Sequence, residues 1–399
     1  MNRKERIILL VLAGLNFTHI LDFMIMMPLN NYLLPYFHIT PRQFSILVAA
    51  YTFSAGISGF TAAFFVDQYD RKKILLLGYS GFLIGTLACG FAPSYPLLLV
   101  ARTFAGMFGG LIGAQVLSIV SDMFGYERRG MAMGIIMSSF AIASIIGVPL
   151  SLYLSNMFSW HAPFIMVALI GVVVLPFIIW MIPPMTAHVQ PGRRSSQFWQ
   201  VLTTVLNDKQ QRNALVFSML IMLGHFMIIP FVNPYMEFNV GYSKQQTPMI
   251  YLAGGLASFI SASILGRLAD KYGKMTVFTT CILFSLITVF SITNLPSIPF
   301  ALTLAIFAFW FILSTGRMVS ANAMISNVVP PEQRGSFMSF NSSVQQLGSG
   351  LASVIAGFII IEGNDHKIYH YNWVGYLSIM VLLAALLMAR RLFIKMDAR

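Results

Sequence analysis

Long apolar runs follow one another along nearly the whole chain, separated by short polar segments. A run of about 20 residues is enough to cross the roughly 30 Å hydrocarbon core of a membrane. Twelve such runs cover approximately residues 7–36, 43–66, 74–92, 96–121, 131–155, 162–183, 213–236, 245–267, 276–293, 298–325, 336–361 and 373–393. The pattern therefore predicts an all-α polytopic membrane protein with twelve transmembrane helices.

The longest interruption, 184–212, separates six runs from six. It divides the chain into an N-terminal bundle (1–183), a linker and a C-terminal bundle (213–399). Within the linker, apolar residues recur at helical spacing over 196–207, after the basic stretch "PGRRSSQ". This spacing predicts a short amphipathic helix on the cytoplasmic interface. A plain linker helix without a binding role fits the same spacing.

The two halves repeat one another. "FFVDQYDRK" at 64–72 corresponds to "GRLADKYGK" at 266–274, so that Asp67 stands opposite Asp270. Asp22, in "LDFMIMMP", stands opposite His225, in "HFMIIP", at the same offset of 203 residues. These matches predict two pseudo-symmetric six-helix bundles from a duplication. Parallel repeats of this kind place a substrate site between the halves, near the membrane midplane.

Composition and charge agree with this class. Hydrophobic residues make up 57% of the chain and charged residues 10%, against about 25% charged in soluble domains. The net charge of +12 could suggest a nucleic-acid partner, but its distribution argues against one. With the N-terminus inside, 20 of the 25 Lys and Arg fall in cytoplasmic segments and 3 outside. The positive-inside rule therefore predicts that both termini lie in the cytoplasm.

The chemistry inside the spans is sparse. The two cysteines are interpreted as packing residues, and the sequence contains no cluster of metal ligands, so no metal or cofactor is expected. Asp22 is the only one of 13 acidic residues placed well inside a span, where a charge costs about 2.5–3.5 kcal/mol. At 1.5 Å per residue, Asp22 and Arg102 lie at about the same depth. We expect an ion pair between them, direct or through water.

Two interpretations of this pair remain open. Asp22 could carry a coupling proton, or it could form a static pair with Arg102 that holds two helices together. His225 is a second titratable group at the matching repeat position. It could take part in proton coupling, or it could be a neutral residue hydrogen-bonded across helices.

Other polar residues within the spans are candidates for lining a substrate cavity. His19 precedes Asp22 by one helical turn. Arg317 could bind an anionic group, pair near an inner gate, or snorkel to the inner surface. The expected cavity holds one carboxylate, two guanidiniums and two histidines, which favours a neutral, amphipathic or weakly anionic solute over a dication. The candidate cavity residues are His19, Gln115, Asn233, Arg317, Asn322, Asn341 and Gln345.

Several motifs resemble the major facilitator superfamily. The loop "GRLADKYGK" carries its signature at Gly266, Asp270, Gly273 and Lys274, while the first-half loop keeps only Asp67 and Arg71. "ARTFAGMFGG" matches its Arg-x-x-x-Gly pattern, "SIIGVPLS" is a degraded antiporter motif, and "WHAPF" resembles the entry to helix 6. Within the superfamily the chain is similar to the bacterial drug and sugar efflux group of proton antiporters.

This resemblance implies a proton-coupled exporter of a drug, sugar or amphipathic metabolite that works by rocker-switch alternating access. It also implies a cytoplasmic gate made of Asp67, Arg71, Gly266, Asp270, Gly273 and Lys274. The expected partners are a small-molecule substrate, protons and membrane lipid, with the chain acting as a monomer. An uncoupled facilitator or a lipid-like flippase, with Asp22–Arg102 as a structural or gating pair, is the alternative. An enzyme is not expected, because a lone buried acid has no catalytic partner.

Overall fold

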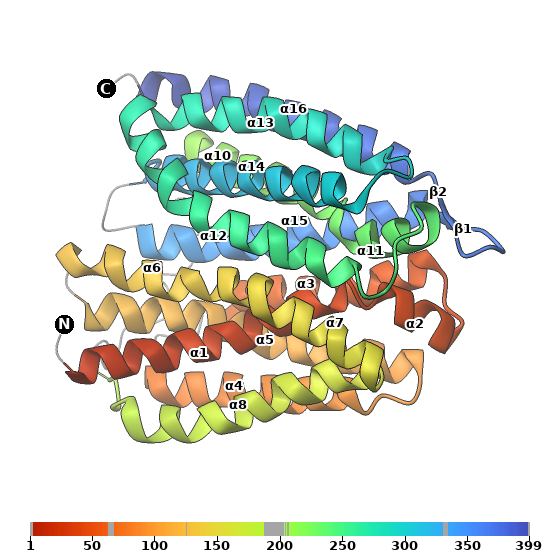
Figure 1. Cartoon of the computed structure of the whole chain (residues 1–399). Coiled ribbons are helices and arrows are strands. Elements are labelled where there is room, and N and C mark those ends of the chain that lie inside the picture. Colours follow the sequence, from red (N-terminus) through yellow and green to blue (C-terminus); the bar gives the residue numbers. More distant parts are fainter. Residues whose placement is uncertain are drawn as a thin grey trace.

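The computed structural model describes residues 3–62, 68–124, 126–186, 203, 205, 207–329 and 334–397, most of them helical (Figure 1). The first half contains α1 (Arg3–Met26), α2 (Asn30–Phe37), α3 (Pro41–Ala62), α4 (Arg71–Gly90), α5 (Tyr95–Met123), α6 (Tyr126–Ile142), α7 (Val148–Met157) and α8 (His161–Met181). The second half contains α10 (Lys209–Phe226), α11 (Val232–Pro234), α12 (Thr247–Tyr272), α13 (Lys274–Thr293), α14 (Phe300–Ser326), α15 (Arg334–Ile359) and α16 (Tyr371–Asp397). A hairpin of β1 (Ile361–Glu362) and β2 (Ile368–Tyr369) precedes α16.

Eleven helical stretches in the described part of the chain are long and apolar enough to cross a membrane. α15 has 26 residues, which span about 39 Å, but polar side chains such as Asn341, Gln345 and Gln346 lower its mean hydropathy. With α15 counted, the helices match the predicted all-α membrane fold of twelve spans in two six-helix halves. The predicted amphipathic helix over 196–207 lies outside the described residues, apart from positions 203, 205 and 207.

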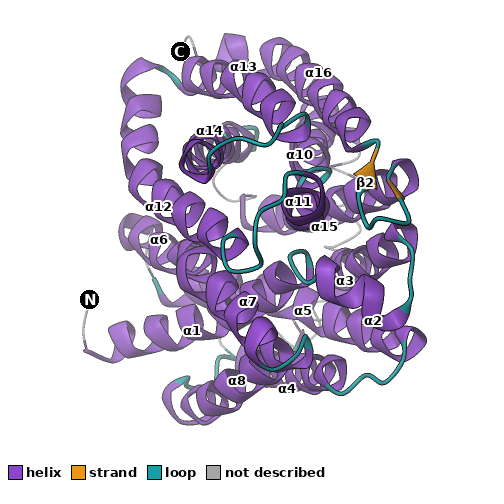
Figure 2. Cartoon of the chain, turned by 45° about the vertical axis from the view of Figure 1, so that its right-hand side comes forward, coloured by secondary structure: helices purple, strands orange, loops and turns teal. Residues whose placement is uncertain are grey.

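The two halves lie side by side, with α1–α8 on one side and α10–α16 on the other (Figures 1 and 2). Both chain termini lie at one end of the bundle, which we call the terminal end (Figure 1). α2, α11 and the β-hairpin lie at the opposite end, which we call the hairpin end. Contact between the halves runs mainly along α3 and α15, and along α6, α7 and α12.

The close contact between α3 and α15 depends on glycine. A Cβ atom at Gly357 would lie 2.0 Å from the Ser45 Oγ and 3.0 Å from the Pro41 carbonyl oxygen. A Cβ at Gly350 would lie 2.5 Å from the Thr52 Oγ1. Small residues at such positions let helix backbones approach closely within a membrane. The two halves are therefore joined by backbone proximity along this pair of helices.

The first helix of each half is interrupted next to a proline, and hydrogen bonds join the residues around one interruption to those around the other. Proline cannot donate a helical hydrogen bond and clashes with the preceding turn. α1 ends before Pro28, and α10 ends before Pro230. Asn30 Nδ2 donates to the Pro230 carbonyl at 3.1 Å, and Asn233 Nδ2 donates to the Pro28 carbonyl at 2.9 Å. We call these two reciprocal bonds, made by buried asparagines 203 residues apart, the Asn–Pro clasp.

The apolar cores show how the halves meet. One core is shared by both halves near the hairpin end and includes Leu29 and Phe44 with Phe231 and Ile368. The two other large cores belong to one half each, except that Phe60 of α3 and Val205 of the linker pack in the second-half core. The halves are thus packed together at the hairpin end, while most of the core toward the terminal end stays within each half.

Candidate functional site

A buried ion pair joins α1 and α5 inside the first half. Arg102 Nη1 donates to Asp22 Oδ2 at 2.7 Å, and both side chains have 0% exposure. The guanidinium carbon lies 4.2 Å from the centre of the Tyr51 ring on α3 and 5.9 Å from that of Phe164 on α8. A desolvated cation–π contact contributes about 2 kcal/mol. The direct contact expected from the matching depths is present, and its proton-carrying role stays a prediction.

The pair uses only part of its hydrogen-bonding capacity. In the part of the chain that the structure describes, Asp22 Oδ1, Arg102 Nε and Arg102 Nη2 are buried without a hydrogen-bond partner, as is the Tyr51 hydroxyl. Leaving a buried polar atom unsatisfied costs about 1–3 kcal/mol. The site is therefore incompletely satisfied in this conformation, and one carboxylate oxygen remains available to accept a proton.

His19 connects this pair with a cavity between the halves. It lies one helical turn before Asp22 and lines a small cavity, together with glycines of α3 and α5, serines of α15 and Gln346. Neither ring nitrogen of His19 has a hydrogen-bond partner. A Cβ at Gly109 would lie 2.9 Å from His19 Nε2 and 2.8 Å from the Tyr51 hydroxyl. The missing side chain at Gly109 lets these two polar groups approach the same point.

The second half has a related but unequal pair, between α10 and α14. Arg317 Nη2 lies 3.2 Å from His225 Nδ1 and 3.5 Å from the Ser314 Oγ. Arginine offers only donors, so Nδ1 must accept, and the contact requires a neutral His225 with its proton on Nε2. Arg317 is 1% exposed, so the snorkelling alternative is wrong.

The two pairs lie on either side of a contact between repeat-related residues. The rings of Phe23 and Phe226, again 203 residues apart, pack with their centroids 5.6 Å apart. Asp22 and His225 directly precede them in the sequence. The first helix of each half therefore carries a titratable group one residue before its contact with the other half: a buried acid in α1 and an imidazole in α10.

The remaining predicted cavity residues do not lie together, and each has different neighbours. Gln345 donates to the Ser218 Oγ at 3.0 Å and to Asn322 Oδ1 at 3.4 Å, which joins α15 to α10 and α14. Gln115 is fully buried with both amide atoms unpartnered, and Asn341 is buried with Oδ1 unpartnered. Asn233, placed in the cavity by the sequence, belongs to the Asn–Pro clasp instead.

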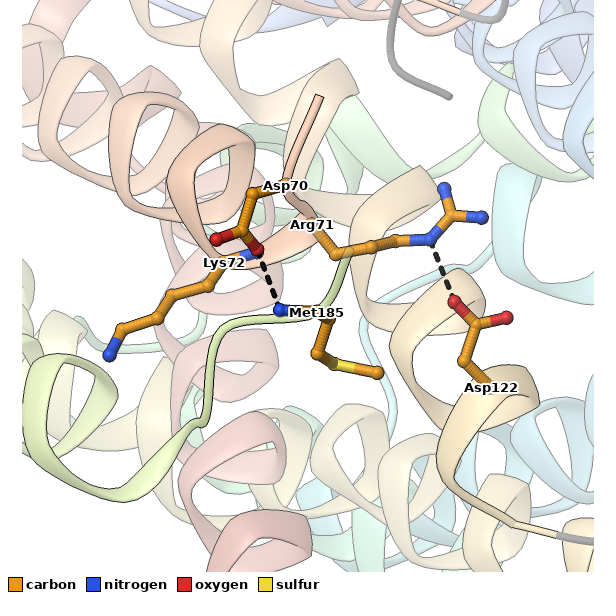
Figure 3. Close-up of polar contacts among 5 residues, drawn as sticks. All are labelled: Asp70, Arg71, Lys72, Asp122 and Met185. Atoms are coloured by element: carbon orange, nitrogen blue, oxygen red, sulfur yellow. Dashed lines mark hydrogen bonds and ion pairs between the residues drawn. The ribbon is translucent and has the colours of Figure 1, made fainter. Parts of the chain in front are cut away.

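The first predicted gate loop is tied to its own half. Asp70 caps α4, where its carboxylate accepts from the Lys72 backbone at 3.0 Å and from the Met185 backbone at 2.8 Å (Figure 3). Arg71 Nε pairs with Asp122 Oδ2 of α5 at 2.9 Å (Figure 3). Asp67 lies outside the described residues.

The second gate loop depends on one glycine conformation. Gly273 ends α12 and begins α13 with φ +91°, a conformation that favours glycine. Gly266 lies seven residues before this turn. A Cβ atom there would meet nothing within 4 Å, so close packing does not require glycine at position 266. Asp270 is exposed and Lys274 is half-buried.

Two structural contributors were not anticipated from the sequence. Nothing distinguished Tyr51 among 15 tyrosines. Asn30 did carry a signal, because it stands 203 residues before Asn233. The degraded antiporter motif "SIIGVPLS" begins in a π-helical turn, Ala143–Gly147, where a Cβ at Gly147 would lie 2.5 Å from Leu21 Cδ1. This turn therefore packs against α1 beside the ion pair.

Comparisons with known proteins find membrane transporters by sequence and by structure. The family model described as Major Facilitator Superfamily matches residues 12–217 and again 214–399. An uncharacterized MFS-type transporter of Bacillus subtilis, YceJ, is 22% identical over 345 residues, covering 85% of each chain. A bacterial homologue of the human lysosomal transporter Spinster, in an inward-facing unoccupied conformation, superposes with TM-score 0.77 at 15% identity, covering 99% of this chain and 98% of that one. A D-xylose–proton symporter superposes with TM-score 0.76 at 16% identity, covering 96% of each chain.

Proposed function

Because the chain belongs to the major facilitator superfamily, we propose that it is a proton-coupled secondary transporter that exports a small organic solute, with Asp22 as the proton carrier. The observation that supports this role is the wholly buried Asp22–Arg102 pair, with one carboxylate oxygen unbonded. Buried ionisable groups in membrane helices are costly, and they commonly mark ion or proton pathways. The exported solute would be a drug, a sugar or an amphipathic metabolite.

The coupling follows from the contact itself. While Arg102 donates to Asp22, the carboxylate is stable in its charged form. If rocking of the halves moves α1 relative to α5, the carboxylate loses its counter-charge at membrane depth. Proton uptake then becomes the less costly way to keep it buried. His19, between the cavity and Asp22, is the group through which the proton would pass.

The conformation supports alternating access with the hairpin end closed. The shared core and the Asn–Pro clasp hold the halves together there. Under the positive-inside rule the terminal end faces the cytoplasm, so this state would be closed toward the outside. The protein would reside as a monomer in a bacterial inner membrane, with both termini cytoplasmic. Opening the hairpin end while closing the terminal end would complete the cycle.

One observation favours a second candidate function. Neither Asp22 nor Arg102 is exposed at all, and the pair is covered by Tyr51. A pair with no access to the cavity could serve only to hold or gate the helices. The protein would then be an uncoupled facilitator or a lipid-like flippase.

Two experiments separate these functions. In liposomes with an imposed pH gradient, a panel of labelled solutes is tested for accumulation by wild type and by Asp22→Asn. We expect Asp22→Asn to lose accumulation against a gradient and to retain some exchange. Persistent accumulation would rule out Asp22 as the obligatory carrier.

The second experiment needs no solute. Infrared difference spectra of wild type between alkaline and acidic pH should contain a protonated-carboxyl band that Asp22→Asn lacks. Glu362→Gln, at a half-buried position of the β-hairpin where the acid pairs with His366, serves as the control for an acid away from the ion pair. An Asp22→Asn spectrum identical to wild type in this region would favour the uncoupled function.

A further inference from the structure

Arg317 carries a buried positive charge that no acidic side chain neutralises. Its side chain is 1% exposed, and within the described part of the chain it forms no ion pair with Asp or Glu. Among the described residues, its Nε and Nη1 atoms have no hydrogen-bond partner. An arginine in a protein cannot escape this situation by losing its proton. An uncompensated buried charge costs several kcal/mol even after relaxation of its surroundings.

The first half shows what is missing. There, a guanidinium of equal burial is neutralised by Asp22, on the first helix of the repeat. The residue at the repeat position of Asp22 in the second half is His225, and its contact with Arg317 requires a neutral imidazole. The second half therefore keeps the cation and lacks the anion.

The surroundings of Arg317 supply further donors. Trp310 and Ser314 stand seven and three residues before Arg317, on the same face of α14. Trp310 Nε1 is buried without a partner, and so is the hydroxyl oxygen of Ser320, one turn further on. His225 adds an Nε2–H in the tautomer that its contact requires. Donors without matching acceptors are the arrangement that an anionic ligand satisfies.

This cluster reaches the boundary between the halves. His225 is only half-buried, and its ring lies 5.2 Å from that of Trp310. The next residue, Phe226, packs against Phe23 of the first half. A solute between the halves could therefore meet the cluster through His225.

We propose that Arg317, with His225 in contact with it and Trp310 packed against His225, is the subsite for an anionic group of the transported solute, a carboxylate or a phosphate. This inference rests on the proposed function only in that the solute passes between the halves. It assigns the two arginines different tasks. Arg102 balances the acid that belongs to the protein, and Arg317 balances the charge that the solute brings.

The test uses purified full-length protein without a pH gradient. Hexanoate, gluconate and hexyl phosphate are titrated at millimolar concentration against their uncharged counterparts hexanamide, glucose and hexanol. Thermal unfolding and tryptophan fluorescence report binding. We expect saturable stabilisation by at least one anion and none by its uncharged counterpart. Trp310→Phe should lose the fluorescence change and weaken the stabilisation, because phenylalanine lacks the Nε1 donor.

Three variants localise the site. Arg317→Gln should weaken anion binding about ten- to hundredfold, the loss of one charge-assisted hydrogen bond. Without ligand it should unfold at a higher temperature than wild type, because an unbalanced charge is removed. Arg317→Lys should keep part of the affinity, and Arg390→Gln, at an exposed position of α16, should change neither property.

Two results would overturn the inference. One is equal binding of the anions and their uncharged counterparts, or no binding of any anion. The other is an Arg317→Gln variant that keeps anion affinity and is less stable than wild type, which would make Arg317 a structural donor to His225. Asp22→Asn should still bind the anion, so failure of proton coupling and failure of this subsite give different results.

Discussion

Removing Arg102 should destabilise the protein through the acid that it leaves behind. In Arg102→Ala, Asp22 stays at 0% exposure and loses its only charged hydrogen-bond donor. Breaking a buried ion pair from one side typically costs about 3–5 kcal/mol. The acid can limit this cost by taking up a proton. For an aspartate free in water that step costs about 4 kcal/mol at pH 7, the equivalent of about three pH units.

The measurement is thermal unfolding in detergent of wild type, Arg102→Ala, Asp22→Asn and the double variant. A loss of about 4 kcal/mol corresponds to about 5 °C if a chain of 399 residues unfolds as one unit. The double variant should recover most of this loss, because the unbalanced acid is gone. Arg390→Ala, which removes an exposed arginine from α16, should stay within about 0.5 kcal/mol of wild type. Equal stability of Arg102→Ala and the double variant would refute the pairing argument.

Three further changes have expected outcomes. Asn233→Ala removes one bond of the Asn–Pro clasp and should shift the access equilibrium up to about tenfold toward an open hairpin end, which spin-label distances across that end would register. Asp270→Asn should shift the population toward a state open at the terminal end, and Asp67→Asn should do so more weakly. Labels on the terminal-end residues of α5 and α14 would show this, and an unchanged distance distribution would exclude gating. Gly357→Ala should lower the unfolding temperature, whereas Gly113→Ala, where a Cβ meets nothing within 4 Å, should not.

Much of the fold could be predicted from the sequence because lipid imposes one simple pattern. Each span must satisfy its own backbone, so a long apolar run indicates a helix. Depth could also be predicted, since a fixed rise per residue placed Asp22 and Arg102 level with each other. Their contact at 2.7 Å agrees with that estimate.

The contacts that depend on helix breaks were harder to predict. The apolar runs 7–36 and 213–236 each predict one span, although Pro28 and Pro230 interrupt the helices there. The sequence therefore predicts Asn233 in the cavity, whereas its amide binds the opposite half in the structure. The contact between Arg317 and His225 also escaped prediction, because a long side chain can reach a partner that lies at a different depth.

The core shared at the hairpin end has a consequence for the heat of the transport cycle. If that end opens to water, apolar side chains such as Leu29 and Phe231 become hydrated. Hydration of apolar surface raises the heat capacity, so the access equilibrium should curve with temperature, and warming from the cold should favour the closed hairpin end. If the halves separated into lipid instead, acyl chains would replace side chains of similar polarity, and the plot should stay nearly straight. The temperature curvature of the conformational equilibrium therefore distinguishes a water-filled pathway from a lipid-facing one, before any solute has been identified.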